Sequence, residues 1–176
     1  VLDKKRGRVL VYDDEQNPLC IFGGTGNQAG RFRNASALEK CGNSYLVVDS
    51  DRNSITVFTE TEYMSLIRKA IREYSEGKYM ESAEYWDEVI KLNSSLPVAY
   101  KGVGRAKLIN GEYKEAMEYL KTGDDRFYYS MAVQNFRREY LRENFLWFVP
   151  LCVVVVLAFV FGMKYLKKAI LNSRKK

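Results

Sequence analysis

The pattern of apolar and polar positions divides the chain into three stretches of different character. Before residue 60, short runs of Val, Ile, Leu and aromatic residues are separated by turn-forming sequences, which predicts β-strands. Between residues 60 and 143, apolar residues recur at every third or fourth position, which predicts amphipathic helices. From Asn144 to Met163 the chain carries no charge and is apolar almost throughout, which predicts a membrane-spanning helix.

The strand region contains clear turn signals and an internal repeat. Gly, Asn, Asp and Pro gather between the apolar runs, as in Asp13–Pro18 and Asp51–Asn53. Residues within Val1–Tyr12 match those within Val47–Phe58 at a constant offset of 46 residues, a period typical of a propeller blade of several strands. The predicted strands are Arg8–Asp13, Leu19–Phe22, Ala35–Lys40, Ser44–Ser50 and Ser54–Thr59.

These residues resemble the NHL repeat of six-bladed β-propellers. The family pattern is met by Val9–Asp13, by the glycine-containing run Ile21–Phe32 and by Gly42–Ser50. The resemblance implies that residues 1–60 are the C-terminal blades of an incomplete all-β propeller. Because the chain begins with Val rather than Met, and because so few blades bury little surface, the remaining blades are expected in a region that precedes it.

The helical stretch has a period of its own, of 34 residues. Gly77–Tyr79 matches Gly111–Tyr113, and Ala70 matches Gly104, at positions where helices must approach closely. This pattern resembles two tetratricopeptide repeats, which implies an all-α domain at residues 61–123 followed by a capping helix at residues 124–143. The predicted helices are Glu62–Glu76, Met80–Leu92, Pro97–Asn110, Lys114–Lys121 and Arg126–Asn144.

The resemblance to tetratricopeptide repeats implies a peptide-binding groove along the first helix of each unit. Tyr74, Lys101 and Arg105 are the candidate ligand-binding residues there. Lys101 and Arg105 lie one helical turn apart, so the pair is suited to hold a carboxylate. The alternative is that both belong to a solvated basic face.

The composition argues against several kinds of chemistry. The chain has no histidine, and its three cysteines form no C-x-x-C pair, so neither a metal site nor another cofactor is expected. Cys20 and Cys41 are left as either free thiols or a disulfide. The run Gly23–Gly30 lacks the Lys-Ser/Thr of a P-loop and precedes a strand, which argues against nucleotide binding. Asp3 and Asp49, at equivalent positions in the repeat, are interpreted as carboxylates that cap turns.

The uncharged run predicts a single transmembrane helix at residues 144–165. About 20 helical residues rise roughly 30 Å, which matches the hydrocarbon core of a bilayer. The formal charge is +6, and the basic excess follows this run, which favours a cytoplasmic tail at residues 166–176 and an extracytoplasmic position for the bulk of the chain. Tyr165 and Trp147 are expected at the two interfaces. The alternative is a core helix buried on all sides.

Together these features predict a membrane-anchored, extracytoplasmic interaction protein of multi-domain architecture rather than an enzyme. Its expected partners are a protein, peptide or cell-wall component and the surrounding lipid, and no nucleic acid is expected because no basic, aromatic sheet face is predicted. The domain order is similar to that of bacterial membrane proteins in which further spans follow the first. The alternatives are a propeller hydrolase resembling lactonases, with its active site in preceding blades, and a cytosolic scaffold held by a C-terminal anchor.

Overall fold

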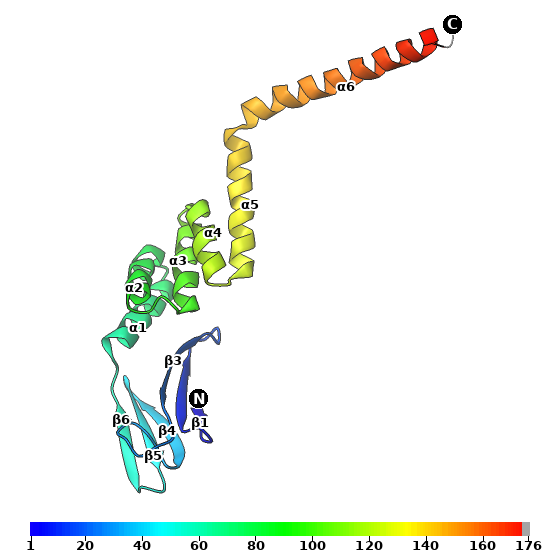
Figure 1. Cartoon of the computed structure of the whole chain (residues 1–176). Coiled ribbons are helices and arrows are strands. Elements are labelled where there is room, and N and C mark those ends of the chain that lie inside the picture. The colour runs from blue at the N-terminus through cyan, green and yellow to red at the C-terminus, as the bar shows by residue number, and fades with distance from the viewer. Residues whose placement is uncertain (174–176) are drawn as a thin grey trace. The chain divides into compact units, whose positions relative to one another are not determined.

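The computed structural model describes the backbone of residues 1–173 and the side chains of residues 1–164. The chain divides into two compact units, Val1–Ala132 and Val133–Lys176. In the first unit the strands gather at one end and helices α1–α4 at the other (Figure 1). The predicted roles of Tyr165 and of the basic side chains at residues 166–176 lie outside the described residues.

The strands form two antiparallel sheets, each of three strands within the described residues, in the orders β1-β2-β3 and β4-β5-β6. Neighbours along the chain are neighbours in the sheet because short turns connect them. The bounds are β1 (Leu2–Asp3), β2 (Arg8–Tyr12), β3 (Pro18–Gly23), β4 (Ala35–Cys41), β5 (Ser44–Asp49) and β6 (Ser54–Phe58).

The sequence repeat corresponds to a repeated hairpin register. Leu2 lies opposite Val9 in the first sheet, and Val48 lies opposite Ile55 in the second, which is the same pairing displaced by the offset of the repeat. The two sheets share a small core in which the ring centroids of Phe22 and Phe58 lie 4.6 Å apart. The 46-residue sequence repeat therefore corresponds to two β-hairpins with the same strand register.

The two recurring aspartates cap turns, as the sequence predicts. Asp3 accepts a hydrogen bond of 3.0 Å from the backbone N–H of Arg6. Asp49 accepts a 3.2 Å hydrogen bond from the backbone N–H of Asp51, in the turn between β5 and β6. Asp49 is 1% exposed and also accepts backbone hydrogen bonds from Arg33 at 2.8 Å and from Asn34 at 3.2 Å. Burial alone would raise the pKa of Asp49, but these backbone N–H groups and the nearby Arg52 guanidinium outweigh burial and lower it.

Stability is expected to fall in acid partly through Asp49. Because its pKa is lower in the folded state than its ordinary value of 3.8, its contribution is present above that value and is lost as the pH falls through the folded-state pKa. We expect the Asp49→Asn variant to be less stable than the parent at pH 7, and the difference to shrink at pH values below about 4. Urea unfolding across this range measures it; a difference that stays constant with pH contradicts the prediction.

Six helices follow the strands within the described residues. Thr61 caps the first of them by accepting a hydrogen bond from the backbone N–H of Met64, and glycines with positive φ, Gly77 and Gly111, end the first helix of each hairpin. Consecutive helices from α1 to α4 pack against one another. The bounds are α1 (Glu62–Ser75), α2 (Tyr79–Leu92), α3 (Pro97–Ile109), α4 (Tyr113–Thr122), α5 (Arg126–Glu143) and α6 (Phe145–Ser173).

Small residues permit these helices to approach closely, as the sequence predicts. Ala70 and Ala116 are fully buried, and the Ser82 hydroxyl donates a 2.7 Å hydrogen bond to the carbonyl of Ala70. A Cβ atom on Gly104 would lie 2.6 Å from a side-chain carbon of Leu120, and one on Gly102 would overlap the indole of Trp86. Glycine at these two positions is therefore a packing requirement.

The Gly102→Ala variant is expected to be destabilised in spite of the higher helix propensity of alanine. Overlap with the buried indole of Trp86 costs about 1–3 kcal/mol, and the gain in propensity is about 0.5–1 kcal/mol, so we expect a net loss of about 1–2 kcal/mol. Urea unfolding followed by circular dichroism measures this loss. An alanine variant as stable as the parent would show that Trp86 moves aside without penalty.

The predicted fold class is wrong. The chain is not an all-β NHL-type propeller fragment at residues 1–60 followed by all-α tetratricopeptide repeats at residues 61–123, but a small α+β protein. Each sheet has three strands rather than the four of a blade. Leu19 of β3 is buried in the same core as Ile67 of α1 and Val98 of α3, so strands and helices share one core. The predicted domain ranges stay a prediction, because compactness alone does not show which segments fold independently.

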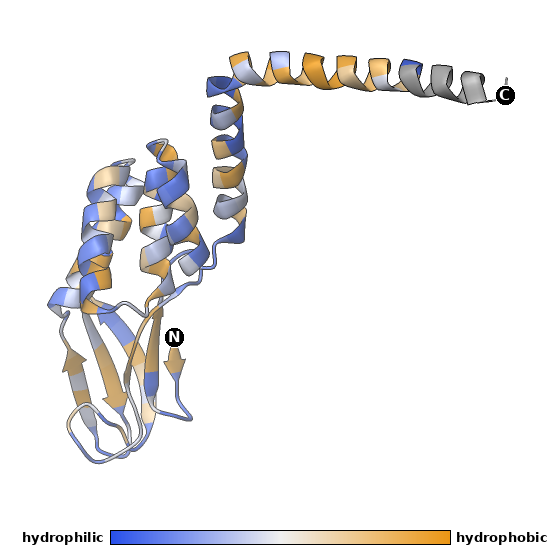
Figure 2. Ribbon diagram, turned by 45° about the horizontal axis from the view of Figure 1, so that its top comes forward, coloured by the Kyte–Doolittle hydropathy of each residue, from blue (hydrophilic) through white to orange (hydrophobic). Residues whose placement is uncertain are grey.

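The second unit contains a helix that is long and apolar enough to cross a membrane. This helix, α6, is predominantly apolar along its described side chains (Figure 2). None of its apolar window, Phe145–Lys164, is buried within the described structure, whereas a core helix would be covered. Pro150 lies in its second turn, near the end where a missing N–H has least effect.

Candidate functional site

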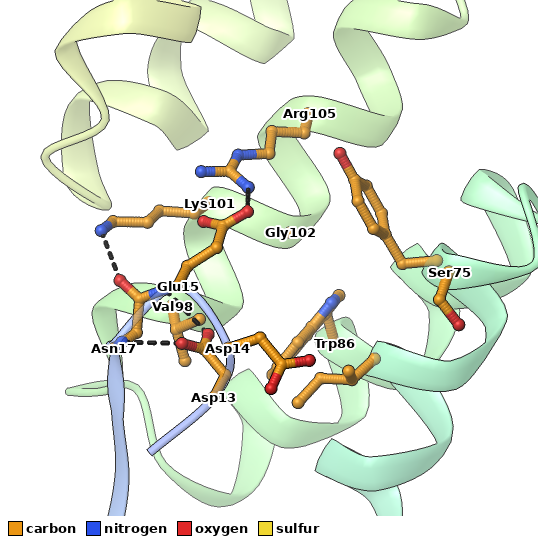
Figure 3. Close-up of a pocket in the computed structure, with 12 residues that line it drawn as sticks. Asp13, Asp14, Glu15, Asn17, Ser75, Trp86, Val98, Lys101, Gly102 and Arg105 are labelled. Carbon is orange, nitrogen blue, oxygen red and sulfur yellow. Dashed lines mark hydrogen bonds and ion pairs between the residues drawn. The ribbon is translucent and has the colours of Figure 1, made fainter.

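The three candidate binding residues come together in one cavity of the first unit. Tyr74 of α1 and Lys101 and Arg105 of α3 line a cavity of about 190 Å³. Its other wall is the turn between β2 and β3, residues 13–17, which the sequence did not identify as part of a site (Figure 3). The cavity therefore combines a helical groove with an acidic turn from the first sheet.

Internal hydrogen bonds fix the turn at residues 13–17. The carboxylate of Asp13 accepts hydrogen bonds from the backbone N–H of Asn17 at 2.7 Å and from its side-chain amide at 2.8 Å. Gln16 adopts a positive φ of 65° and donates its backbone N–H to the Asp13 carbonyl. These bonds hold the short acidic run Asp13–Glu15 in one conformation.

Two contacts join this turn to α3. The ammonium of Lys101 donates a 2.8 Å hydrogen bond to the side-chain oxygen of Asn17, and the guanidinium of Arg105 lies 2.7 Å from a carboxylate oxygen of Glu15 (Figure 3). The partners are 84 and 90 residues apart in the sequence. Side-chain contacts thus fasten the first sheet to the helical part of the unit.

Arg105 is the most heavily engaged residue of the site. Its Nε donates a 2.9 Å hydrogen bond to Asp125, which is 8% exposed, and its guanidinium lies 4.4 Å from the ring centroid of Tyr128. Burial alone would lower the pKa of Arg105, but hydrogen bonds to Glu15 and Asp125 outweigh burial and raise it. The hydrogen bond between Arg105 and Glu15 also lowers the pKa of the Glu15 carboxyl group. Arg105 therefore stays protonated, and its positive charge is balanced by the carboxylates of Glu15 and Asp125.

Asp125 also connects the site to the start of α5. Its second carboxylate oxygen accepts a 3.3 Å hydrogen bond from the backbone N–H of Tyr128, three residues ahead, as an N-cap residue does. One carboxylate thus satisfies both the guanidinium of Arg105 and the first turn of a helix. Nothing in the sequence pattern indicated that Asp125 has a partner on α3.

The carboxylate predicted to lie on Lys101 and Arg105 has a counterpart within the chain, Glu15. The side chain of Arg105 is only 13% exposed, so it is not part of a solvated basic face. The roles of Tyr74, Lys101 and Arg105 in binding a partner stay a prediction. In the structure, the ammonium of Lys101 already contacts the side-chain amide of Asn17, and the guanidinium of Arg105 already contacts the carboxylates of Glu15 and Asp125.

Some polar groups of the cavity have no hydrogen-bond partner among the described residues. The carboxylate of Asp14 makes no hydrogen bond or ion pair there, and the indole N–H of Trp86 donates none, although Trp86 is only 3% exposed. Ile71, Tyr74 and Val98 complete the wall. Burial raises the pKa of the Tyr74 hydroxyl, which therefore stays protonated at neutral pH. Sequence periodicity does not show that Trp86 borders a cavity.

A larger cavity lies between the sheets and α1. It measures about 430 Å³, and its lining includes Phe22, Tyr45, Phe58 and Met64. Cys20 also lines it, and burial raises the pKa of its thiol. Cys20 and Cys41 are both free thiols, so the alternative of a disulfide between them is not realised. Within the described residues, no group of three or more Cys, Asp or Glu side chains is arranged to hold a metal ion.

The cavity at Arg105 thus offers aromatic and aliphatic walls, a free carboxylate and a free N–H donor, an arrangement suited to binding. The comparisons bear on the resemblances that the sequence suggested. Neither the NHL repeat nor the tetratricopeptide repeat is supported as a family assignment. The chain matches no protein-family model, no curated protein and no solved structure.

Proposed function

We propose that the protein is a membrane-anchored interaction protein that binds a protein or peptide through the cavity at Arg105. The observation that carries the proposal is α6, whose apolar window is exposed along its whole length within the described part of the chain. About 20 apolar residues are enough to span the hydrocarbon core, and an equally exposed apolar helix in water would aggregate. Lipid is the environment in which such a helix is stable.

The charge distribution supports a cytoplasmic C-terminus. Lys164, Lys167, Lys168 and Arg174–Lys176 follow the apolar window without an intervening acid. The residues ahead of the window carry arginines interleaved with acids, in Arg126–Glu143. Because Lys and Arg are retained on the cytoplasmic side, this bias favours an extracytoplasmic first unit.

The cavity at Arg105 supports the binding role. Apolar and aromatic side chains with a few unsatisfied polar groups are typical of sites that recognise a ligand. Its wall is rigid, because the turn at residues 13–17 is hydrogen-bonded internally and to α3. A preorganised wall lowers the entropy lost on binding.

Carbonate extraction and protease protection test the proposal. The full chain, expressed in bacterial cells, is expected to remain in the membrane pellet after washing with alkaline carbonate. Added protease should then digest the first unit in cells whose outer layers are opened but whose inner membrane is intact. Recovery in the soluble fraction would overturn the anchor. A pelleted protein that resists protease would instead favour the cytosolic scaffold with a C-terminal anchor.

A further inference from the structure

We infer that the cavity at Arg105 receives a lysine or arginine side chain of the partner, rather than the carboxylate that its two basic residues suggest. This inference rests on the proposed binding function and specifies the chemistry of the same site. It depends on which of the groups in the wall are already satisfied and which are free.

The basic residues of the cavity are poorly placed to hold a carboxylate. Arg105 is compensated by both Glu15 and Asp125, at 2.7 and 2.8 Å. Lys101 donates to Asn17, whose amide in turn donates to Asp13. A carboxylate from a partner would have to displace Glu15 or Asp125 to pair with Arg105. At Lys101, which has no counter-ion among the described residues, it would approach the three acids of the same wall.

The net charge of the lining is negative. Asp14 lines the cavity and has no counter-ion or hydrogen-bond donor among the described residues. Carboxylates outnumber cations in the lining, with Asp13, Asp14 and Glu15 facing Lys101 and Arg105. A cation entering here gains an ion pair with Asp14 without breaking an existing contact.

Aromatic walls favour the same ligand. Tyr74 and Trp86 border the cavity, and an ammonium or guanidinium group is attracted to the faces of such rings. The indole N–H of Trp86 borders the cavity without an acceptor while the rest of the side chain is buried. The backbone carbonyl of a bound peptide would satisfy this donor.

The size of the cavity fits the end of one side chain. The volume of about 190 Å³ is below the roughly 300–1,000 Å³ of pockets that take whole small ligands. That is enough for a charged head and part of its aliphatic stem, and too little for a folded element. Ile71 and Val98 provide apolar surface for the stem.

Fluorescence titration of the full chain in non-ionic detergent tests the inference. The chain has two tryptophans, so the Trp147→Phe background leaves Trp86 as the only reporter, inside the wall itself. The probes are blocked tripeptides, Gly-X-Gly, in which X is Lys, Arg, norleucine or Glu. We expect the Lys or Arg peptide to change the emission of Trp86 saturably, and the norleucine and Glu peptides to have no effect at the same concentration.

Matched variants identify the group responsible. Asp14→Asn is expected to weaken binding of the basic peptide by about tenfold, whereas Glu84→Gln, which removes an exposed charge from α2, should leave it unchanged. Equal binding of the norleucine peptide, tighter binding of the Glu peptide, or an unchanged affinity in Asp14→Asn would overturn the inference. Since the titration is made in detergent, its failure is separate from failure of the anchor, which appears only in the extraction experiment.

Discussion

Replacement of both Val154 and Val155 by arginine is expected to release the protein from the membrane fraction. The two residues lie at the centre of the apolar window Phe145–Lys164, about ten residues from either end. Each arginine at the centre of a spanning helix costs about 2.5–3.5 kcal/mol on insertion, so the pair costs about 5–7 kcal/mol. Carbonate extraction of cells that express the variant measures the shift from pellet to supernatant.

The matched control replaces the same two residues by leucine. Leucine keeps the helix apolar and is a better helix former than valine, so this variant should stay in the pellet. The thermal unfolding of the first unit should be alike in both variants, because the substitutions lie in the second. An arginine variant that still resists extraction would mean that α6 is not the element that anchors the chain.

Replacement of Arg105 by methionine is expected to have the largest effect on the stability of the first unit. Methionine preserves much of the aliphatic volume but leaves the carboxylate of Asp125 buried without its cation. Breaking a buried pair from one side costs about 3–5 kcal/mol, and because Arg105 retains some exposure we expect about 2–4 kcal/mol. Urea unfolding of the detergent-solubilised chain, followed by circular dichroism, measures the loss.

A nearby exposed pair provides the control. Arg126 and Asp124 form an ion pair with both side chains at least 80% exposed, and Arg126→Met should therefore change the stability by less than about 0.5 kcal/mol. If the two methionine variants lose the same stability, burial of the Arg105 pair is not what makes it important. The double variant Arg105→Met, Asp125→Asn should recover part of the loss, because the unpaired charge is then removed.

Positions of individual elements could be predicted from the sequence because they depend on local patterns. The predicted strand Ser54–Thr59 is β6 (Ser54–Phe58), and the predicted helix Pro97–Asn110 is α3 (Pro97–Ile109). Alternation, turn residues and caps act within a few positions of one another. The apolar run likewise predicted α6, since length and lack of charge are sufficient for that assignment.

Assembly of these elements could not be predicted in the same way. A repeat period specifies the spacing of elements but not the number of strands in a sheet or the partner of each apolar face. Leu19 looks in sequence like any other strand residue, and nothing near it indicates that it packs among helices. The site depends on pairings across 84 and 90 residues, so Tyr74, Lys101 and Arg105 were identifiable while Asp14 and Glu15 were not.

The fastening of the β2–β3 turn to α3 has a consequence for the order of folding during synthesis. A ribosome adding about 5–20 residues per second takes roughly 5–18 s to produce Arg105 after Glu15. Through this interval the acidic turn lacks its counter-ions, and Leu19 lacks the helices that cover it. We therefore expect nascent chains arrested before α3 to be cut by protease within the first sheet, and chains arrested well after α4 to be protected there.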